Sequence, residues 1–184
     1  MNVISTELKD VYILEPTVHG DHRGWFMESW SQRTMEEHGL SYQFVQDNHS
    51  YSSRKGTLRG LHCQKGEAAQ AKLVRCTRGR IMDFVVDVRL GSPTYKKWFS
   101  VELSADNFRQ LLIPRGFLHG YLSLTDDVEF VYKADNYYNK EADRTILWND
   151  PDLGVDWGIS DPIVSEKDAK ATVFALSDLD FIYK

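Results

Sequence analysis

Four side chains in this sequence have the chemistry needed to move a proton next to a carbonyl group. His62 lies ten residues ahead of Lys72, and both fall in stretches that we expect to be strands. His119 and Tyr132 follow in the segments IPRGFLHGYL and VEFVYK, at inward-facing positions of further predicted strands. A base and a cation set in a rigid sheet are what proton abstraction beside a carbonyl requires. Together with a second imidazole and a phenol, they indicate an isomerase that works through an enolate.

The elements that must position these residues are short strands. From residue 58 onward the apolar pattern has a period close to two, and it predicts strands over 81–90, 98–103, 110–113 and 129–134. The N-terminal part mixes extended runs at 11–14 and 25–30 with one helix, which Ser31 could cap and Gly39 could end. Such a series of short strands predicts an all-β jelly roll with small helices at its edges.

The overall composition narrows the function classes. A chain of 184 residues fits one domain, and 42% apolar with 27% charged residues is ordinary for a globular protein. The formal charge of −5 argues against a nucleic-acid-binding surface and against a basic face for a membrane. Two cysteines, Cys63 and Cys76, are too few for a disulfide scaffold, and we see no signal peptide or membrane-spanning stretch. We therefore expect a cytoplasmic protein.

Seven motifs stand in order along the chain: DHRGWFMESW (21–30), QDNHSYSSRKGTLRGLHCQ (46–64), QAKLVRC (70–76), VVDVRLGSPTY (85–95), IPRGFLHGYL (113–122), WNDPDLGVDW (148–157) and SEKDA (165–169). With these motifs the chain resembles the dTDP-4-dehydrorhamnose 3,5-epimerase family, sugar-nucleotide epimerases of the cupin class. The resemblance implies a cupin-type jelly-roll barrel with no metal and no cofactor. It also implies a single domain over 1–184, in which an N-terminal arm (about 1–50) makes homodimer contacts and a C-terminal segment (about 148–184) covers the barrel.

The resemblance assigns a role to each candidate catalytic residue. His62 would be the base, with Asp168 of the SEKDA segment fixing its tautomer and stabilising the imidazolium. The alternative is that Asp168 only caps a short helix, because Ser165 and Asp168 form an S-x-x-D capping pattern. Lys72 would stabilise the enolate oxygen, with His119 as a second donor, although a surface lysine on an edge strand is the alternative for Lys72. Tyr132 would deliver a proton to the opposite face, since a phenol with a pKa of about 10 is protonated at neutral pH.

The resemblance also implies a nucleotide-binding set. Arg59 and Arg23 would meet the diphosphate, because guanidinium groups match phosphate oxygens. The remaining residues would contact the nucleotide or complete the site, in part from the neighbouring subunit: Gln46, Asn48, Tyr138, Asp143, Lys167, Phe26 and Glu28. Three positions depart from what is usual in the family, namely Asp143 in place of Glu, Leu118 in place of a small residue and Cys63 in place of an aromatic one. These departures bear on the preferred nucleotide or sugar.

The predicted substrate is a nucleoside-diphosphate 4-keto-6-deoxyhexose, with dTDP-4-dehydro-6-deoxyglucose as the first choice and dTDP-4-dehydro-L-rhamnose as its product. Inversion at C3 only or C5 only is the alternative within the family. A ketoisomerase is disfavoured because ketoisomerases lack the tyrosine acid, which this chain has in Tyr132. A metal-dependent cupin is disfavoured because the H-x-H pattern is missing at His62-Cys-Gln64. A non-catalytic sugar-nucleotide-binding module would need neither Lys72 nor Tyr132 nor the pair of His62 and Asp168.

Overall fold

A computed structural model describes all residues 1–184, and β-strands dominate it. The strands are β1 (Asn2–Ser5), β2 (Tyr12–Glu15), β3 (Val18–Asp21), β4 (Gly24–Met27), β5 (Gln46–Ser52), β6 (Leu58–Gln64), β7 (Lys72–Arg78), β8 (Arg80–Asp87), β9 (Trp98–Ser104), β10 (Gln110–Ile113), β11 (Phe117–Ser123), β12 (Val128–Ala134) and β13 (Asp143–Thr145). The helices are short: α1 (Gln32–Glu37), α2 (Glu166–Ala169) and the 3-10 turns η1 (Gly66–Ala68) and η2 (Phe174–Leu176). The prediction of an all-β chain with small helices at its edges is confirmed.

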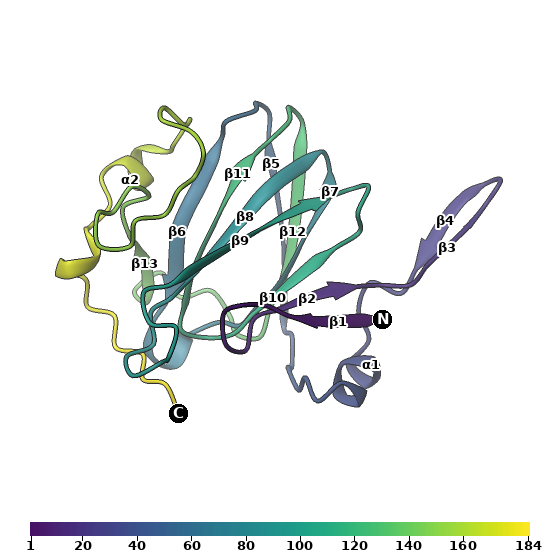
Figure 1. Cartoon of the computed structure of the whole chain (residues 1–184), viewed down its shortest axis with the longest axis horizontal. Coiled ribbons are helices and arrows are strands. Elements are labelled where there is room, and N and C mark those ends of the chain that lie inside the picture. Colours follow the sequence, from purple (N-terminus) through teal and green to yellow (C-terminus); the bar gives the residue numbers. More distant parts are fainter.

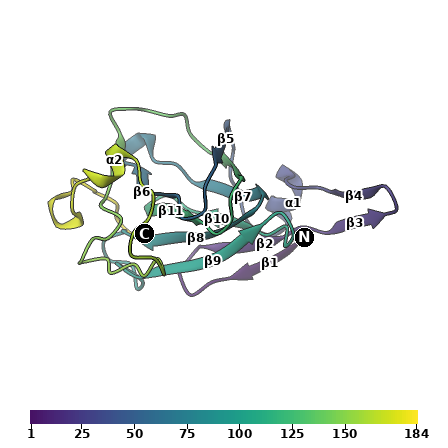
Figure 2. The ribbon, with the colours of Figure 1, turned by 90° about the horizontal axis from the view of Figure 1, so that it is seen from above.

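Two antiparallel sheets face each other (Figures 1 and 2). One has the strand order β1-β2-β10-β7-β12-β5, and the other has the order β13-β6-β11-β8-β9. Strand β8 shows how the sequence builds this sandwich, because its side chains alternate between the two faces of its sheet. Ile81 and Val85 join the core between the sheets, whereas Phe84 and Val86 pack on the opposite face. The hydrophobic period of two in this segment therefore reflects two separate apolar layers, one on each side of the strand.

The C-terminal segment forms the layer on the outer face of the five-stranded sheet. Leu153, Trp157 and Phe174 are buried there together with Phe84, and the rings of Phe84 and Trp157 lie 4.3 Å apart between centroids. The indole N–H of Trp157 donates to the carbonyl oxygen of Trp148 at 2.7 Å, and this bond ties together the two ends of the loop over residues 148–157. This packing places α2 beside β6 (Figure 1), so that the side chains of α2 reach the edge of the sandwich.

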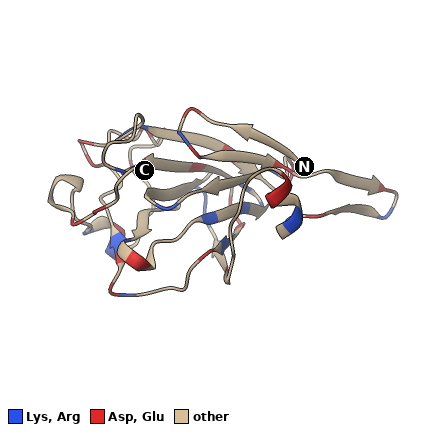
Figure 3. Ribbon diagram, turned by 90° about the horizontal axis from the view of Figure 1, so that it is seen from below, with Lys and Arg blue, Asp and Glu red and all other residues tan.

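The hairpin of β3 and β4 projects away from both sheets (Figures 1 and 2). Two large apolar side chains on it, Trp25 and Phe26, are 56% and 71% exposed. Side chains of both charge signs are interspersed along the ribbon (Figure 3). None of the helices has the length and apolar character needed to cross a membrane.

Candidate active site

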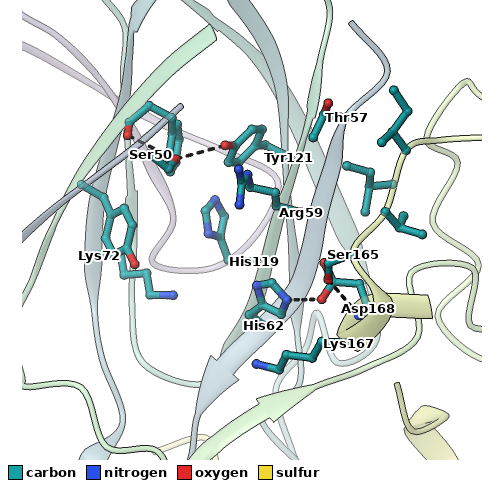
Figure 4. A pocket seen from close by; sticks show the side chains of 15 residues that line it. Ser50, Thr57, Arg59, His62, Lys72, His119, Tyr121, Ser165, Lys167 and Asp168 are labelled. Atoms are coloured by element: carbon teal, nitrogen blue, oxygen red, sulfur yellow. Dashed lines mark hydrogen bonds and ion pairs between the residues drawn. The ribbon is translucent and has the colours of Figure 1, made fainter. Parts of the chain in front are cut away.

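A cavity of about 480 Å³ opens between the two sheets, next to α2 (Figure 4). The strands and α2 contribute side chains to it from opposite sides, and Figure 4 shows Lys72 on one side and His62 with Asp168 on the other. The predicted site residues that line this cavity are Arg59, His62, Lys72, His119, Tyr132, Lys167 and Asp168. All five predicted catalytic residues thus meet in one place, although they are spread over more than a hundred positions of the sequence.

His62 and Asp168 form the closest ionisable pair in the cavity. Nε2 of His62 lies 2.6 Å from Oδ1 of Asp168, and the Asp168 side chain is only 4% exposed. Burial opposes ionisation of Asp168, but the hydrogen bonds from His62 and Ser165 and the charge of His62 outweigh it, and the pKa of Asp168 is lowered. An ionised carboxylate only accepts hydrogen bonds, so Nε2 of His62 donates and Nδ1 is the nitrogen left to take up a proton.

The helix cap and the contact with His62 do not compete, because they use different atoms of Asp168. The hydroxyl of Ser165 accepts from the backbone N–H of Asp168 at 3.1 Å, as the capping pattern predicts. The carboxylate of Asp168 remains available for His62. The capping pattern in the sequence therefore fixes the position of Asp168 and leaves its side chain to interact with the imidazole.

A close approach of two backbones places His62 beside His119. His62 of β6 and His119 of β11 are paired in the sheet, and the register shifts just after His119. At this point Gly60 and Gly120 face each other, and a Cβ atom on Gly60 would lie 2.7 Å from the Cα of Gly120. Gly60 also has φ +145°, a conformation that other residues rarely adopt. Glycine at both positions therefore lets the two histidine-bearing strands approach.

Lys72 and Tyr132 enter the cavity from the opposite sheet. Strand β7 lies between β10 and β12, so the alternative that Lys72 is a surface residue on an edge strand is wrong. The Lys72 Nζ atom is 5.5 Å from the centroid of the Tyr132 ring. Burial lowers the pKa of Lys72, and burial together with the charge of Asp143 raises the pKa of Tyr132. At neutral pH the phenol therefore keeps its proton and can donate it.

Asp83 is a residue of this site that the sequence reasoning missed. It is 0% exposed, and its carboxylate oxygens lie 2.9 and 3.1 Å from Nε2 of His119. The signal available in the sequence was a carboxylate at an inward position of the apolar strand IMDFVVDV, between the core residues Ile81 and Val85. An isolated charge is costly in such a place, so a partner is required.

A second group of predicted residues forms a connected string beside the cavity. The Gln46 side chain donates to Asn48 at 3.1 Å and accepts from the backbone N–H of Tyr138 at 3.0 Å. The hydroxyl of Tyr138 donates to Asp143 at 3.4 Å, and Lys167 Nζ lies 2.6 Å from the same carboxylate oxygen. Tyr138 is 58% exposed, and the Asn48 Nδ2 group is buried with no partner in the protein. An exposed ring and a free buried donor suit contacts with a ligand.

The arginines predicted to meet a diphosphate lie in different places. Arg59 lines the cavity and is held by hydrogen bonds from Nε to Ser52 Oγ at 3.2 Å and from its terminal nitrogen to the carbonyl oxygen of Tyr51 at 3.0 Å. Arg23 sits on the projecting hairpin and pairs with Asp21 at 2.6 Å. Phe26 is exposed on the same hairpin, and Glu28 follows it and accepts from Thr34. The fold of one chain does not bring these three residues into the cavity.

The side chains do not form a transition-metal site. No three His, Cys, Asp or Glu side chains lie close enough together to hold a metal ion. Gln64, which stands where the H-x-H pattern would have its second histidine, uses its amide to bind backbone groups of Ala68, Tyr137 and Asn139. Cys63 is buried, and burial raises the pKa of its thiol to about 12. Cys63 is therefore a packing residue.

The variant Asp168→Asn tests the pair with His62. An asparagine can still accept a hydrogen bond from Nε2 of His62, but it cannot stabilise the imidazolium by charge, so we expect proton abstraction to slow by about 10²–10⁴-fold. The measurement is the rate of solvent deuterium incorporation into a 4-keto sugar nucleotide. Asp161→Asn, on the exposed loop before α2, is the matched control. A rate for Asp168→Asn equal to that of the control would contradict a role in the chemistry.

Comparison with known proteins agrees with this geometry. The family model for dTDP-4-dehydrorhamnose 3,5-epimerase matches residues 5–175. The chain is 52% identical to the dTDP-4-dehydrorhamnose 3,5-epimerase of Shigella flexneri over 97% of this chain and 98% of that protein. Among solved structures, the dTDP-4-dehydrorhamnose 3,5-epimerase of Bacillus anthracis with bound TDP and pyrophosphate is 46% identical, with a TM-score of 0.92 over 94% of this chain and 99% of that one.

A second solved structure carries a sugar nucleotide. The dTDP-6-deoxy-D-glucose-3,5-epimerase of Legionella pneumophila, in complex with dTDP-4-keto-L-rhamnose, is 43% identical, with a TM-score of 0.94 over 100% of this chain and 98% of that one. Such identity along almost the full length confirms the family and the cupin-like jelly roll that the motifs predict. The chain belongs to the dTDP-4-dehydrorhamnose 3,5-epimerase family.

Proposed function

We propose that this protein inverts C5 and C3 of a nucleoside-diphosphate 4-keto-6-deoxyhexose, converting dTDP-4-dehydro-6-deoxy-D-glucose to dTDP-4-dehydro-L-rhamnose. The observation that carries the proposal is the two-sided cavity. A histidine paired with a buried carboxylate enters from one sheet, and a protonated phenol with a buried lysine enters from the other. The names of the relatives support the choice of substrate.

The arrangement supports a mechanism in which the C4 carbonyl acidifies the protons on both neighbouring carbons. Nδ1 of His62 takes the proton from C5, and the electron pair of the broken C–H bond moves to the C4 oxygen as an enolate. Lys72 donates a hydrogen bond to that oxygen, an interaction worth on the order of 3–4 kcal/mol when well aimed. Tyr132 then delivers a proton to C5 from the opposite face, which inverts the centre. Once His62 has lost its proton to solvent and Tyr132 has regained one from solvent, the same steps at C3 complete the reaction.

The experiment that tests this proposal is incubation with dTDP-4-dehydro-6-deoxyglucose in D2O, followed by NMR of C3 and C5. We expect deuterium at both carbons together with inversion at both. Deuterium at one carbon alone would make the protein a single-centre epimerase. Tight binding of the sugar nucleotide with no exchange would replace the proposal with a non-catalytic binding module.

The projecting hairpin supports a further part of the proposal, which is a homodimer. The resemblance implies that Arg23, Phe26 and Glu28 complete the site of the neighbouring subunit, and one chain leaves Trp25 and Phe26 exposed on a hairpin that forms a separate two-stranded sheet. Exposed apolar side chains on a projecting element are typical of an interface. The proposal also places the enzyme in the cytoplasm, a reducing compartment that suits two free buried cysteines.

Mixing two inactive variants tests whether the hairpin acts on the neighbouring subunit. One protein carries His62→Ala, and the other carries Arg23→Ala with Phe26→Ala. In a mixed dimer, the chain that keeps His62 would receive an intact hairpin from its partner, so we expect unfolding and refolding the mixture to restore epimerase activity. Leu176→Ala, at an apolar residue 79% exposed elsewhere, is the control for loss of surface apolar area. If sedimentation shows that the refolded mixture is dimeric but its epimerase activity is not restored, the exchange of hairpins between subunits is contradicted.

A further inference from the structure

Asp83 is the most deeply buried ionisable group beside the cavity, and it touches no substrate-facing surface itself. It is 0% exposed and does not line the cavity, whereas its partner His119 does. Asp83 points inward from β8 between Ile81 and Val85, which both belong to the apolar core between the sheets. A carboxylate has no packing advantage over an apolar side chain in such a layer, and burying it without a partner is costly. Its presence therefore needs a reason other than stability.

The contacts of Asp83 suggest that reason. Both carboxylate oxygens face Nε2 of His119, at 2.9 and 3.1 Å. An ionised carboxylate only accepts, so Nε2 carries the proton and the His119 ring is held in one orientation at the wall of the cavity. The Phe130 ring lies nearly parallel to that of His119, with centroids 5.9 Å apart and 22° between the ring planes. The ring of His119 is thus restrained both at its edge and across its face.

Asp83 also acts on the charge of Lys72. Lys72 has no hydrogen-bonded or ion-paired partner of its own, and burial lowers its pKa, while the negative charge of Asp83 acts in the opposite direction. Burial raises the pKa of Asp83, and the charges of His119 and Lys72 oppose that rise. The three groups lie on three different strands, β8, β11 and β7, so their proximity is a property of the closed sandwich.

We infer that Asp83 is a positioning residue of the epimerase site: its carboxylate orients His119 through Nε2, so that His119 can meet the enolate oxygen. This inference rests on the proposed function. Asp83 itself does not touch the substrate. It acts through His119, which lines the cavity.

Other groups also face Lys72 and contribute to its charge state. The titratable groups around it, apart from Asp83, come from β6, β11, β12, β13 and α2, and they are Arg59, His62, Cys63, His119, Tyr121, Tyr132, Asp143, Lys167 and Asp168. Of the carboxylates, Asp143 is already paired with Lys167 and Asp168 with His62. Asp83 is the carboxylate whose only hydrogen-bonding partner is His119, and its charge acts on the pKa of Lys72 in the same direction as that of Asp143.

The test compares Asp83→Asn with the wild-type enzyme over a pH series. Lys72 supports the enolate only as an ammonium ion, so the alkaline fall in kcat follows the pKa of Lys72, because burial moves the pKa of Tyr132 the other way. The charge of Asp83 raises the pKa of Lys72 together with that of Asp143, so we expect Asp83→Asn to move the alkaline limb of the kcat profile to lower pH. We expect kcat to fall by about 10- to 100-fold, as for other residues that orient a functional histidine. KM changes little, because the predicted nucleotide contacts lie elsewhere.

Asp87→Asn is the matched control. Asp87 is on the same strand and is equally buried, but it binds Arg89, Ser92 and Thr94 outside the cavity. We expect it to lower thermal stability and to leave the alkaline limb where it is in the wild type. If Asp83→Asn keeps the kcat and the pH profile of the wild type, the inference is wrong while the proposed function stands. If the wild-type enzyme itself exchanges no deuterium, the proposed function fails first.

A second measurement needs no variant at position 83. In protein labelled with ¹⁵N at histidine, long-range proton–nitrogen spectra report which ring nitrogen carries the proton, and the His119→Asn spectrum assigns the signals. We expect Nε2 of His119 to be protonated across the neutral pH range. An unprotonated Nε2 would overturn the inference even if Asp83→Asn fails to fold.

Discussion

Replacement His62→Ala is expected to abolish exchange of solvent deuterium at both C3 and C5. Nε2 of His62 is held by the buried carboxylate of Asp168, at 2.6 Å, which leaves Nδ1 as the nitrogen that can take up a proton. Nε2 of the other imidazole, that of His119, is engaged by Asp83 within the core. General acid–base catalysis is worth roughly 10²–10⁴-fold, so loss of the proposed base takes the rate at both carbons down together. The measurement is NMR of the sugar ring protons in D2O.

His49→Ala is the matched control for this prediction. His49 is also paired with a carboxylate, Glu129, at 3.2 Å, but it lies on the outer face of β5 and is 58% exposed. The His49→Ala variant should catalyse deuterium exchange at the wild-type rate. Exchange by His62→Ala that persists at one carbon and stops at the other would show that each carbon has its own base. In that case a single base serving both centres would be the wrong model.

The sequence predicts the fold well where one face of a strand packs in an apolar core. Strands predicted over 98–103, 110–113 and 129–134 appear as β9, β10 and β12 within one residue at each end. The strand predicted over 81–90 ends earlier, at Asp87, because that side chain turns to bind Arg89, Ser92 and Thr94 in the following turn. Hydrophobic periodicity reports burial of side chains, and it does not report where hydrogen bonds to a loop begin.

Strand β5 shows why periodicity misses some elements. Its sequence QDNHSYS contains no aliphatic residue, and it is a seven-residue strand paired with β12 along its whole length. Its inward positions carry Gln46, Asn48 and Ser50, and Ser50 lines the cavity. A strand that borders a polar cavity needs polar residues on the side that would otherwise be apolar. The missing hydrophobic signal at β5 is therefore a consequence of its position beside the site.

The residues of the candidate site could be predicted mainly because their motifs resemble those of the epimerase family. Physical reasoning from single residues indicated a base, a cation and a phenol, but it could not show that β6 and β7 lie on opposing sheets with the cavity between them. It also missed Asp83, because an aspartate in an apolar strand is informative only once its neighbour across the sheet is known. Arg23, Phe26 and Glu28 stay predictions, since their place depends on a second chain.

Replacement Tyr132→Phe is expected to separate proton exchange from inversion. The phenylalanine keeps the ring beside Lys72 and Phe130, so the cavity keeps its shape and His62 can still remove a proton. The enolate then has no donor on the opposite face and is reprotonated from the face of His62. We expect deuterium to enter C5 and C3 with the original configuration, while formation of the inverted product falls by about 10²–10⁴-fold.

Tyr51→Phe separates this effect from the general loss of a tyrosine hydroxyl. Tyr51 lies on the outer face of β5 and donates to Asp127, away from the cavity, so its variant should invert both centres normally. Because burial and the charge of Asp143 raise the pKa of Tyr132, the wild-type phenol stays protonated throughout the neutral range, and the ratio of exchange to inversion should not change there with pH. Normal inversion by Tyr132→Phe would mean that the second proton comes from another group. The two-sided arrangement of His62 and Tyr132 would then be a feature of the cavity wall and not of the mechanism.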